Sequence, residues 1–590
     1  MKYQLDFSLF SISEHSLNVE FSGYVEDEAI LQGGYSRPKA ILYFDNGKEN
    51  RRIPLVIQDL QYLGNRCVFS GKYRYQLDHV FWSTKGMNLE TKLSVHFSYG
   101  SEYLEDAAFS LLEKAYSCDE KNWKCAPGEN HFVMSPVAAK KANPFKRFVI
   151  QPLAWLFDQI TLLLGLCMIP WFFLEALLCF IGIAQWDKKV RSHNPIRRII
   201  GHINRRVLGF ARRKVTLVKM FKTVIQLLYR VFCIFPIKKN RITFISMRRT
   251  ELSGNFAFVY EQMKERKDLD IHFILSYSNS VWMSLRDTFR FCYACAVSKV
   301  IVLDEFTPQI HYLDLRKETK LVQLWHACGA FKTFGFTRLG KPAGSPQVTR
   351  NHRSYDYVTV SSTYCKRCHS EGFGISDEKI IPTGIARTDV FFDEEYKQKV
   401  QAAFYEKYPQ LREKKLLLFA PTFRGTVKET AHYPMERMDL KALYEEIGDE
   451  YAILVKHHPF VSEKHPIPAE YKDQILDLSE ETELNDLLFV TDLIITDYSS
   501  LIFEAALLKI PMLFYVFDLN EYIRQRDFYF DLRLESPGKL VYSQKELTDA
   551  ILSKDFEAEQ MDAFAKKFFD DFDGRSTERI VALIEKALKE

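Results

Sequence analysis

The stretch FVTDLIITDYSSLIFE, residues 489–504, decides the fold predicted for the second half of the chain. Its apolar, β-branched run at 493–495 predicts a short buried strand. An apolar-periodic helix begins directly after Asp497-Tyr498-Ser499-Ser500, so the strand and the helix meet through serines. Such a turn presents free backbone N–H groups and the positive end of a helix dipole at the carboxyl edge of a sheet. The stretch therefore predicts an anion site in an α/β protein, although a simple serine-capped helix also fits it.

The length and composition are those of a large globular protein. The chain has 590 residues, of which 47% are hydrophobic and 26% charged, enough for three or four domains. The net charge of +4 hides a block from Lys188 to Thr250 with eighteen Lys or Arg and no Asp or Glu, so the remainder carries −14. Such a block needs an anionic partner, either nucleic acid or a membrane surface. Eleven cysteines without regular spacing predict no disulfide framework and a reducing compartment.

The first 130 residues predict a small accessory β-sandwich. Short runs of alternating polar and apolar residues, such as 3–10, 17–21 and 40–44, are typical of half-buried strands. Asp45-Asn46-Gly47 between two such runs predicts a hairpin turn. The runs carry no catalytic cluster, so binding of a carbohydrate or polymer and a structural or positioning role both stay open. The N-terminus has no basic segment followed by an apolar core, so we expect no signal peptide.

Residues 145–237 predict peripheral or monotopic attachment to the cytoplasmic face of a membrane. The stretch 159–186 carries one charge, Glu175, in twenty-eight positions, which is long enough to cross a bilayer. Pro170 and Glu175 near its middle favour a hairpin that dips into one leaflet, with basic flanks on the same side. Residues 196–235 then mix apolar and Arg residues, a pattern typical of helices lying on phospholipid headgroups. Nucleic acid is the alternative partner, and a buried helix pair is the alternative structure.

From residue 238 the pattern changes to repeated strand, turn and helix units. The predicted strands form two groups, at 242–246, 271–276, 299–303, 321–325, 357–360 and 379–381, and at 415–419, 452–456, 475–477, 493–496 and 512–514. We therefore predict two Rossmann-like domains, 238–395 on the acceptor side and 396–590 on the donor side. A deep cleft should separate the carboxyl edges of their parallel sheets. This is the general plan of nucleotide-sugar transferases of the GT-B kind.

Basic and imidazole side chains gather at the predicted carboxyl edges of these strands. They are His326, Lys332, Arg387, Arg424, Lys456 and His458, together with Ser499 and Ser500 of the opening stretch. Each alone is commonplace, and a histidine at a strand end is more often structural than catalytic. Their shared position favours a binding site, and this number of cations and N–H groups suits a diphosphate better than a neutral sugar.

Six ordered motifs resemble a known family. They are LWHACGAFKTFG (324–335), TGIARTD (383–389), APTFRG (420–425), LVKHHP (454–459), DLIITDYSSLIFE (492–504), and FYVFD with RDFYFD (514–531). Over about residues 240–590 they resemble the CDP-glycerol glycerophosphotransferase family of teichoic-acid primases and polymerases, including ribitol-phosphate relatives. The resemblance implies a membrane-associated cytoplasmic enzyme of GT-B fold. Such an enzyme transfers an alditol phosphate from CDP-glycerol or CDP-ribitol to a hydroxyl of an undecaprenyl-type lipid-linked acceptor and releases CMP.

The resemblance also implies roles for individual residues. His326 and His458 match the two catalytic histidines of the family. The family's donor-binding positions fall on Gly329, Ala330, Arg387, Pro421, Thr422, Lys456, Ser499, Ser500 and Glu504. We add Lys332 and Arg424 to this predicted set, because both follow predicted strands at the carboxyl edges of the sheets. The chain departs from more usual family forms in its His-Ala-Cys-Gly at 326–329, its Ala-Arg-Thr at 386–388 and its Glu504, which leaves the donor and the acceptor open.

The predicted reaction is an in-line attack of an acceptor hydroxyl on the β-phosphorus of the CDP-alditol. His326 is the candidate base, an effect that typically contributes roughly 10²–10⁴-fold. His458 with Lys456 would stabilise charge on the transferring or leaving phosphate. The serine turn of the opening stretch would hold the diphosphate, and Glu504 would hold the ribose.

No cofactor is expected for this chemistry. No Asp-x-Asp pair follows a predicted strand, so we expect no tightly held catalytic metal. Two C-x-x-C pairs, 292/295 and 365/368, leave a four-thiolate zinc site as an alternative, but both lack the usual turn glycines. The alternative functions are a GT-B glycosyltransferase using a nucleotide sugar for cell-surface polysaccharide and a non-catalytic membrane scaffold that binds a polymer. The final polymer, teichoic acid or capsule, and a homo-oligomeric state also stay open.

Overall fold

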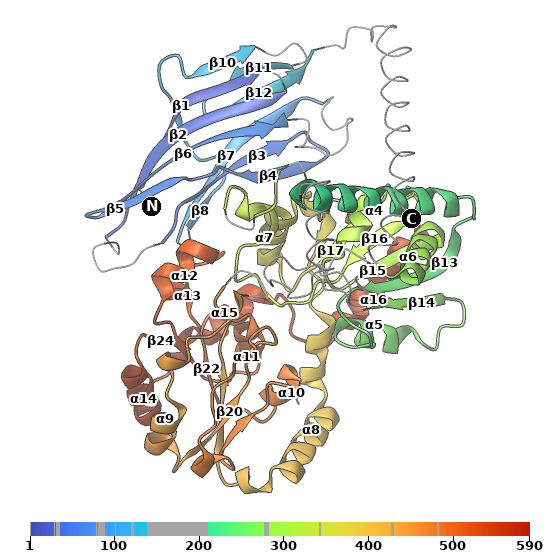
Figure 1. The fold of residues 1–590 in the computed structure, drawn as a ribbon. Helices are drawn as coiled ribbons and strands as arrows, with labels where there is room; N and C mark the ends of the chain where they lie inside the picture. Colours follow the sequence, from blue (N-terminus) through green and yellow to red (C-terminus); the bar gives the residue numbers. More distant parts are fainter. Residues whose placement is uncertain are drawn as a thin grey trace, which may run out of the picture.

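The computed structural model describes most of the chain outside one long segment (Figure 1). The described residues are 2–137 and 210–590, except 14, 29, 31–35, 78–79, 81–88, 101, 120–122, 277–282, 342–343, 348, 426–429 and 481–482. Side chains of the helix that begins at residue 210 are described from 221 onward. The predicted leaflet hairpin at 159–186 and the start of the basic segment, 196–209, lie outside the described residues.

Residues 2–136 form two six-stranded sheets that share one hydrophobic core (Figure 1). One sheet has the order β10-β1-β2-β6-β5 with β9 beside β1, and the other has β11-β12-β7-β3-β4 with β8 beside β7. The strands are β1 Lys2–Ser13, β2 Ser16–Glu26, β3 Lys39–Asp45, β4 Asn50–Pro54, β5 Asp59–Leu63, β6 Arg66–Gln76, β7 Thr91–Tyr99, β8 Glu102–Leu104, β9 Ser110–Leu111, β10 Tyr116–Asp119, β11 Trp123–Pro127 and β12 His131–Pro136. Phe7 and Phe21 from one sheet and Phe44 and Phe97 from the other are buried in this core. The predicted turn at Asp45-Asn46-Gly47 is confirmed, because β3 and β4 pair antiparallel across it.

The first parallel sheet has the strand order β14-β13-β15-β16-β17-β18. Its strands are β13 Lys238–Ser246, β14 Asp270–Leu275, β15 Ser298–Leu303, β16 Lys320–Gln323, β17 Tyr357–Thr359 and β18 Ile380–Ile381. The helices α5 (Asn255–Met263), α6 (Leu285–Val297) and α7 (Thr363–Phe373) lie between them in sequence. Every residue of β15 is buried, as expected for a strand covered on both faces. Each strand predicted for this half overlaps one of those observed.

The second parallel sheet has the strand order β21-β20-β19-β22-β23-β24. Its strands are β19 Lys415–Ala420, β20 Tyr451–Val455, β21 Ile475–Asp477, β22 Leu493–Thr496, β23 Met512–Tyr515 and β24 Lys539–Val541. Its helices are α8 Glu394–Lys407, α9 Leu440–Ile447, α10 Leu484–Leu488, α11 Leu501–Leu507, α12 Leu519–Arg526, α13 Leu532–Glu535, α14 Gln544–Ser553 and α15 Met561–Phe568. The strand and helix predicted from 489–504 are confirmed as β22 and α11. The pattern misses β24, because three residues after Pro537-Gly538 are too few for a periodic signal.

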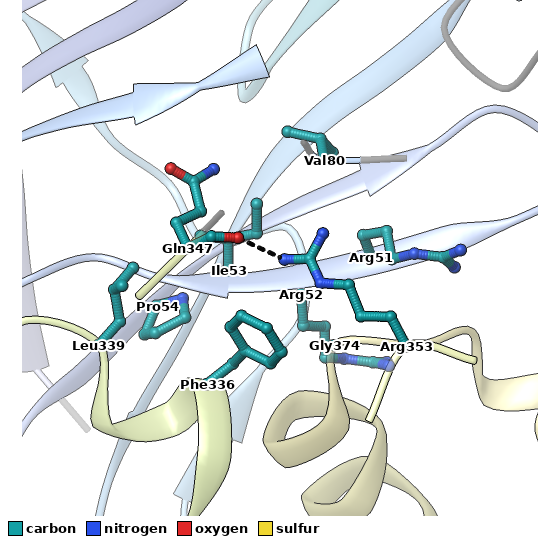
Figure 2. Close-up of a pocket in the computed structure, with 10 residues that line it drawn as sticks. All are labelled: Arg51, Arg52, Ile53, Pro54, Val80, Phe336, Leu339, Gln347, Arg353 and Gly374. Atoms are coloured by element: carbon teal, nitrogen blue, oxygen red, sulfur yellow. Dashed lines mark hydrogen bonds between the residues drawn. The ribbon is translucent and has the colours of Figure 1, made fainter. Parts of the chain in front are cut away.

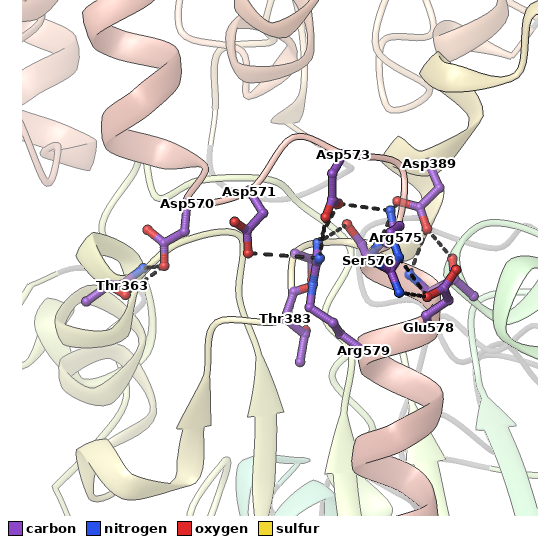
Figure 3. Close-up of polar contacts among 12 residues, drawn as sticks. Thr363, Thr383, Asp389, Asp570, Asp571, Asp573, Arg575, Ser576, Glu578 and Arg579 are labelled. Atoms are coloured by element: carbon purple, nitrogen blue, oxygen red, sulfur yellow. Dashed lines mark hydrogen bonds and ion pairs between the residues drawn. The ribbon is translucent and has the colours of Figure 1, made fainter.

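The last helix, α16 (Ser576–Lys589), returns to the first sheet. Ile580 packs in one cluster with apolar residues of β13. Asp389 holds the start of the helix, because its carboxylate accepts the N–H groups of Ser576 and Thr577 at 3.0 and 2.7 Å (Figure 3). A helix from the range predicted for the second domain therefore packs against the first sheet, since its apolar face is buried there.

The helix α4 (Phe210–Phe232) lies against α6 and leads into the first sheet (Figure 1). Its residues Ile225 and Tyr229 are buried in the core of that half. Leu227 and Val231 are exposed instead. None of the helices in the described parts of the chain combines the length and the apolar character needed to cross a membrane.

The two halves touch through the loop that follows β16. Gly329 has a φ of +60°, in the left-handed region, and its backbone lies against the ring of Phe503 in α11. A Cβ at this position would lie 2.4 Å from that ring. Further along the loop, Lys332 forms an antiparallel bridge with Phe528. Only glycine therefore lets the loop lie this close to α11.

Replacing Gly329 by alanine is expected to destabilise the fold by about 2–5 kcal/mol, because a left-handed alanine and an overpacked contact both cost free energy. Urea unfolding of the full chain measures the loss. Gly64→Ala is the matched control, since Gly64 has a φ of +61° and no atom within 4 Å of its would-be Cβ. It should lose only about 1–2 kcal/mol. Equal losses in the two variants would show that the contact with Phe503 is not a constraint.

Candidate functional site

His326 lies just beyond the carboxyl end of β16 and remains open to solvent. Trp325 before it has a φ of +59°, which is uncommon for a residue other than glycine. The His326 side chain is 42% exposed, and its Nδ1 lies 3.2 Å from Oε2 of Glu305. A carboxylate beside Nδ1 favours the tautomer that carries its proton there and leaves Nε2 as an acceptor. The ring is therefore oriented so that Nε2 can take a proton.

Desolvation and neighbouring guanidinium groups keep the His326 ring neutral. Burial against the surrounding chain and the guanidinium of Arg387 lower the pKa of His326 to about 4, while Asp304 acts in the opposite direction. Arg249 and Arg248 reinforce the effect of Arg387. At neutral pH the imidazole is therefore unprotonated, as a general base must be before it accepts a proton.

Glu305 is a site residue that the family motifs did not reveal. It follows β15 directly after Asp304, which is fully buried and paired with Arg249 at 2.6 Å. Burial raises the pKa of Glu305, and Arg249 and Arg248 oppose that shift. The sequence does contain a signal, because two acidic residues follow the strand 299–303. Since β15 and β16 are neighbours, those residues share the carboxyl edge with His326.

His458 comes from the second half, and its hydrogen bonding defines its tautomer. The N–H of Phe460 donates to Nδ1 at 3.1 Å, so the neutral ring carries its proton on Nε2. Burial and then the ammonium of Lys332 lower the pKa of His458 to about 4. The ring of Phe423 packs beside it, with the centroids 4.7 Å apart. His458 therefore offers an N–H donor rather than a positive charge.

Lys332 supplies the positive charge near His458. Its Nζ lies 3.4 Å from the hydroxyl of Tyr522 in α12. Burial lowers the pKa of Lys332 to about 8, Asp497 opposes the shift, and Arg526 and Arg424 reinforce it. Within the described part of the chain, no carboxylate lies within ion-pair distance of this ammonium. Its charge is thus available to an anionic ligand.

Arg387 and Glu504 form a buried ion pair. The Arg387 guanidinium also donates to Oδ1 of Asn485 at 2.9 Å, and its backbone N–H donates to Oδ1 of Asn255 at 3.0 Å. The Glu504 side chain is 3% exposed. Its Oε2 has no hydrogen-bond partner among the described residues. The contact of Glu504 with a ribose stays a prediction, and in this structure its carboxylate holds Arg387.

Arg424 is also engaged by carboxylates. It donates to both oxygens of Asp518 at 2.6 and 2.9 Å and to Asp497 at 2.8 Å. The other oxygen of Asp497 accepts the N–H of Thr422 at 2.8 Å. These bonds tie the loop after β19 to the ends of β22 and β23. A substrate phosphate would have to compete with two carboxylates for this guanidinium.

The remaining predicted residues differ in solvent exposure and in their hydrogen-bond partners. Lys456 donates from Nζ to the backbone oxygens of Leu478 and Ser479 at 3.0 and 3.1 Å, and burial lowers its pKa. Ser499 accepts the N–H of Leu501 at 3.3 Å, while Ser500 caps α11 without a side-chain bond to its N–H groups. Both serines are half-buried, whereas Gly329, Ala330, Pro421 and Thr422 are buried.

Two sets of side chains lie along the loop through which the halves touch. His326, Glu305 and Arg387 form one set, and His458 and Lys332 form the other. The short loop 326–332 contributes one member to each, so it connects the proton acceptor with the cation. In the described parts of the chain, no group of three or more His, Cys, Asp or Glu is placed to hold a metal ion. The C-x-x-C pairs lie in α6 and α7.

Known proteins resemble this chain over somewhat more than three fifths of its length. It is 46% identical over 364 residues to the teichoic acid poly(ribitol-phosphate) polymerase of Bacillus spizizenii, which covers 62% of this chain and 59% of that protein. It is 41% identical to the ribitol-phosphate polymerase TarK of Staphylococcus aureus, over 61% of this chain and 71% of that protein. The teichoic acid ribitol-phosphate primase of Bacillus spizizenii is 35% identical, over 64% of this chain and 98% of that protein.

The fold is shared with a solved enzyme structure, and a family model covers the same region. The wall teichoic acid polymerase TagF superposes with a TM-score of 0.52 at 21% identity, covering 68% of this chain and 99% of that one. At that identity the likeness concerns the fold, a mixed α/β arrangement of parallel sheets. The model of the CDP-glycerol:poly(glycerophosphate) glycerophosphotransferase family matches residues 227–586. The chain therefore belongs to the CDP-glycerol:poly(glycerophosphate) glycerophosphotransferase family.

Proposed function

We propose that the protein transfers an alditol phosphate from a CDP-alditol to a hydroxyl of a lipid-linked acceptor and releases CMP. The observation that carries this proposal is the exposed, neutral His326 held by Glu305, within a region that matches the family. Ribitol phosphate is the favoured unit, because four relatives with 35–46% identity are named as ribitol-phosphate polymerases or a ribitol-phosphate primase. A relative named for glycerol phosphate is 31% identical. Teichoic acid is accordingly the favoured product.

The chemistry follows from the state of His326. Its Nε2 removes the proton from the acceptor hydroxyl, a new P–O bond forms to that oxygen, and the P–O bond to CMP breaks. The carboxylate of Glu305, 3.2 Å from Nδ1, stabilises the imidazolium that forms. An incoming diphosphate adds negative charge near Arg387, which offsets the effect of that guanidinium and raises the pKa of His326. The base therefore becomes stronger when the donor is bound.

The second half supplies the electrostatic part of the mechanism. The ammonium of Lys332 and the Nε2–H of His458 both suit the oxygens of the transferring phosphate. Ser499 and Ser500 at the start of α11 are proposed to hold the diphosphate, with Lys456 nearby at the end of β20. Arg387 and Arg424 act from fixed positions, because their carboxylate partners hold their guanidiniums in place.

We also propose peripheral attachment to the cytoplasmic face of the membrane through residues 145–237. The described end of this segment supports that proposal. Val231 of α4 and Ile234 after it are exposed, and so are Leu285 and Phe289 of α6. The two helices adjoin, because the rings of Phe232 and Phe289 are in edge contact. With the acid-free basic block beside them, these apolar side chains suit a headgroup interface.

A donor panel tests the proposed function. The full-length protein is incubated with a defined lipid-linked acceptor and, separately, CDP-ribitol, CDP-glycerol and common UDP-sugars. CMP should appear with a CDP-alditol, fastest with CDP-ribitol, and the acceptor should gain alditol-phosphate units. Release of UDP from a UDP-sugar without any CMP would favour a glycosyltransferase. Tight binding to anionic vesicles without nucleotide release from any donor would favour a scaffold.

His326→Ala and His458→Ala are each expected to lower CMP release by about 10²–10⁴-fold, because one removes the proton acceptor and the other an N–H donor to the phosphate. Initial rates of CMP release with the best donor measure the effect. His326→Ala should retain the wild-type urea midpoint within error, since that side chain is 42% exposed. His458→Ala should lower the midpoint slightly, because its half-buried ring packs beside Phe423 and accepts the N–H of Phe460. Turnover like that of the wild type in either variant would contradict the role assigned to that histidine.

Glu305→Gln is expected to lower kcat by about 10-fold or more and to shift the acid limb of the pH–rate profile to lower pH. His326 acts when neutral, so activity falls as the pH drops through its pKa. The carboxylate stabilises the imidazolium, and removing its charge lowers that pKa and weakens the base. Glutamine keeps a polar oxygen beside Nδ1, so Glu305→Ala should lose more activity. An unchanged acid limb in Glu305→Gln would disprove the pairing.

A further inference from the structure

The loop that carries His326 ends in the core of the N-terminal sheets. We name residues 326–341 the cleft loop. Leu339 is 3% exposed and belongs to the same hydrophobic cluster as Ile53 and Val56. Figure 2 shows Leu339 beside Ile53 and Pro54 of β4. Gly340 has a φ of +75°, and a Cβ there would lie 2.5 Å from Val56. The far end of the cleft loop is thus docked into the first two sheets.

The middle of the cleft loop is bound to the second half. The N–H of Thr333 donates to the backbone oxygen of Asp527 at 3.1 Å, and its hydroxyl donates to the backbone oxygen of Arg526 at 2.8 Å. The N–H of Tyr529 donates to the backbone oxygen of Phe331 at 2.9 Å. Lys332 lies between these bonds. The position of its ammonium therefore depends on how segment 527–529 is held.

Asp527 contacts both the cleft loop and the N-terminal sheets. It is buried and has φ 62° and ψ 155°, a conformation that residues with a side chain rarely adopt. Its carboxylate pairs with Lys341 of the cleft loop at 2.7 Å and lies 3.9 Å from Nζ of Lys39 in β3. Lys39 also donates to the backbone oxygen of Phe528. Burial would raise the pKa of Asp527, but Lys341, Lys39 and Arg37 hold it well below its usual range.

We propose that Asp527 is a positioning residue for the transfer reaction, through which the N-terminal sheets set the place of the cleft loop. The proposal rests on the proposed function. A buried carboxylate that has ammonium partners on two separate bodies is satisfied only while both are docked. Displacing β3 or Lys341 leaves that charge buried with fewer partners. The positions of Lys332 and His326 relative to the second half therefore depend on the docking of the N-terminal sheets.

The same interface offers a matched control. Arg52 of β4 pairs with Asp377 at 2.5 Å and donates to the hydroxyl of Ser370 at 3.3 Å. This ion pair also joins the N-terminal sheets to the rest of the chain. The pair joins β4 to the turn after α7, and among the described residues no hydrogen bond or ion pair links Arg52 or Asp377 to residues 326–341. Its loss should weaken docking without moving Lys332.

The test compares Asp527→Asn, Lys341→Met, Lys341→Arg and Arg52→Met in the full-length protein. Asp527→Asn and Lys341→Met should lower kcat by about 10- to 100-fold with a smaller change in the KM of the donor, because a misplaced loop impairs reaction geometry more than binding. Lys341→Arg should restore most of the rate. Hydrogen exchange across residues 326–341 should quicken in the first two variants, whereas Arg52→Met should change neither the exchange of the loop nor kcat.

The exchange measurement separates this proposal from the proposed function. If the wild-type protein releases no CMP from any donor, the proposed function fails, yet faster exchange of the loop in both variants still supports coupling through Asp527. Wild-type exchange and kcat in Asp527→Asn and Lys341→Met would overturn the proposal. It would also be overturned if Arg52→Met lowered kcat as much as Lys341→Met, because docking in general would then explain the effect.

Discussion

The contact between the two parallel-sheet halves depends on one close approach, the backbone of Gly329 against the ring of Phe503. A side chain at this position would have to occupy the space of the ring. Because the loop lies directly on α11, the few residues around it reach both halves: His326 on one side and Lys332 on the other. His326 and Lys332 are thus held by one short, packed piece of backbone rather than by two independent loops.

Two of the four predicted phosphate-binding cations already have carboxylate partners within the protein. Arg424 is shared by Asp497 and Asp518, and Arg387 is paired with Glu504. Buried ion pairs of this kind recover little net stability after desolvation, but they fix the position of each charge. The structure therefore separates cations that position the site from those still open to a ligand, of which Lys332 is the clearest case in the described part of the chain.

The N-terminal sheets take part in this arrangement rather than standing apart from it. Leu339 is buried in their core, and Lys39 reaches the backbone and the carboxylate of the segment 527–529. Of the two roles left open by the sequence, binding of a polymer and positioning, these contacts favour positioning. They also give a reason for the unusual backbone of Asp527, since a strained residue persists only when its surroundings hold it from several sides.

The sequence by itself determined the parts of this protein that depend on local pattern. Hydrophobic periodicity located β22 and α11 and the other strands of both parallel sheets except β24, and the motifs placed His326 and His458 at carboxyl ends. Glu305 was not predicted as a site residue, because its partner His326 is twenty-one residues away in the sequence. The two are brought together only by the neighbouring strands β15 and β16. Only the tertiary structure decided that Arg424 and Glu504 bind other side chains, that α16 belongs with the first sheet, and that Asp527 joins three parts of the chain. The physical reason is that burial and charge pairing are set by residues far apart in sequence, which no local pattern contains.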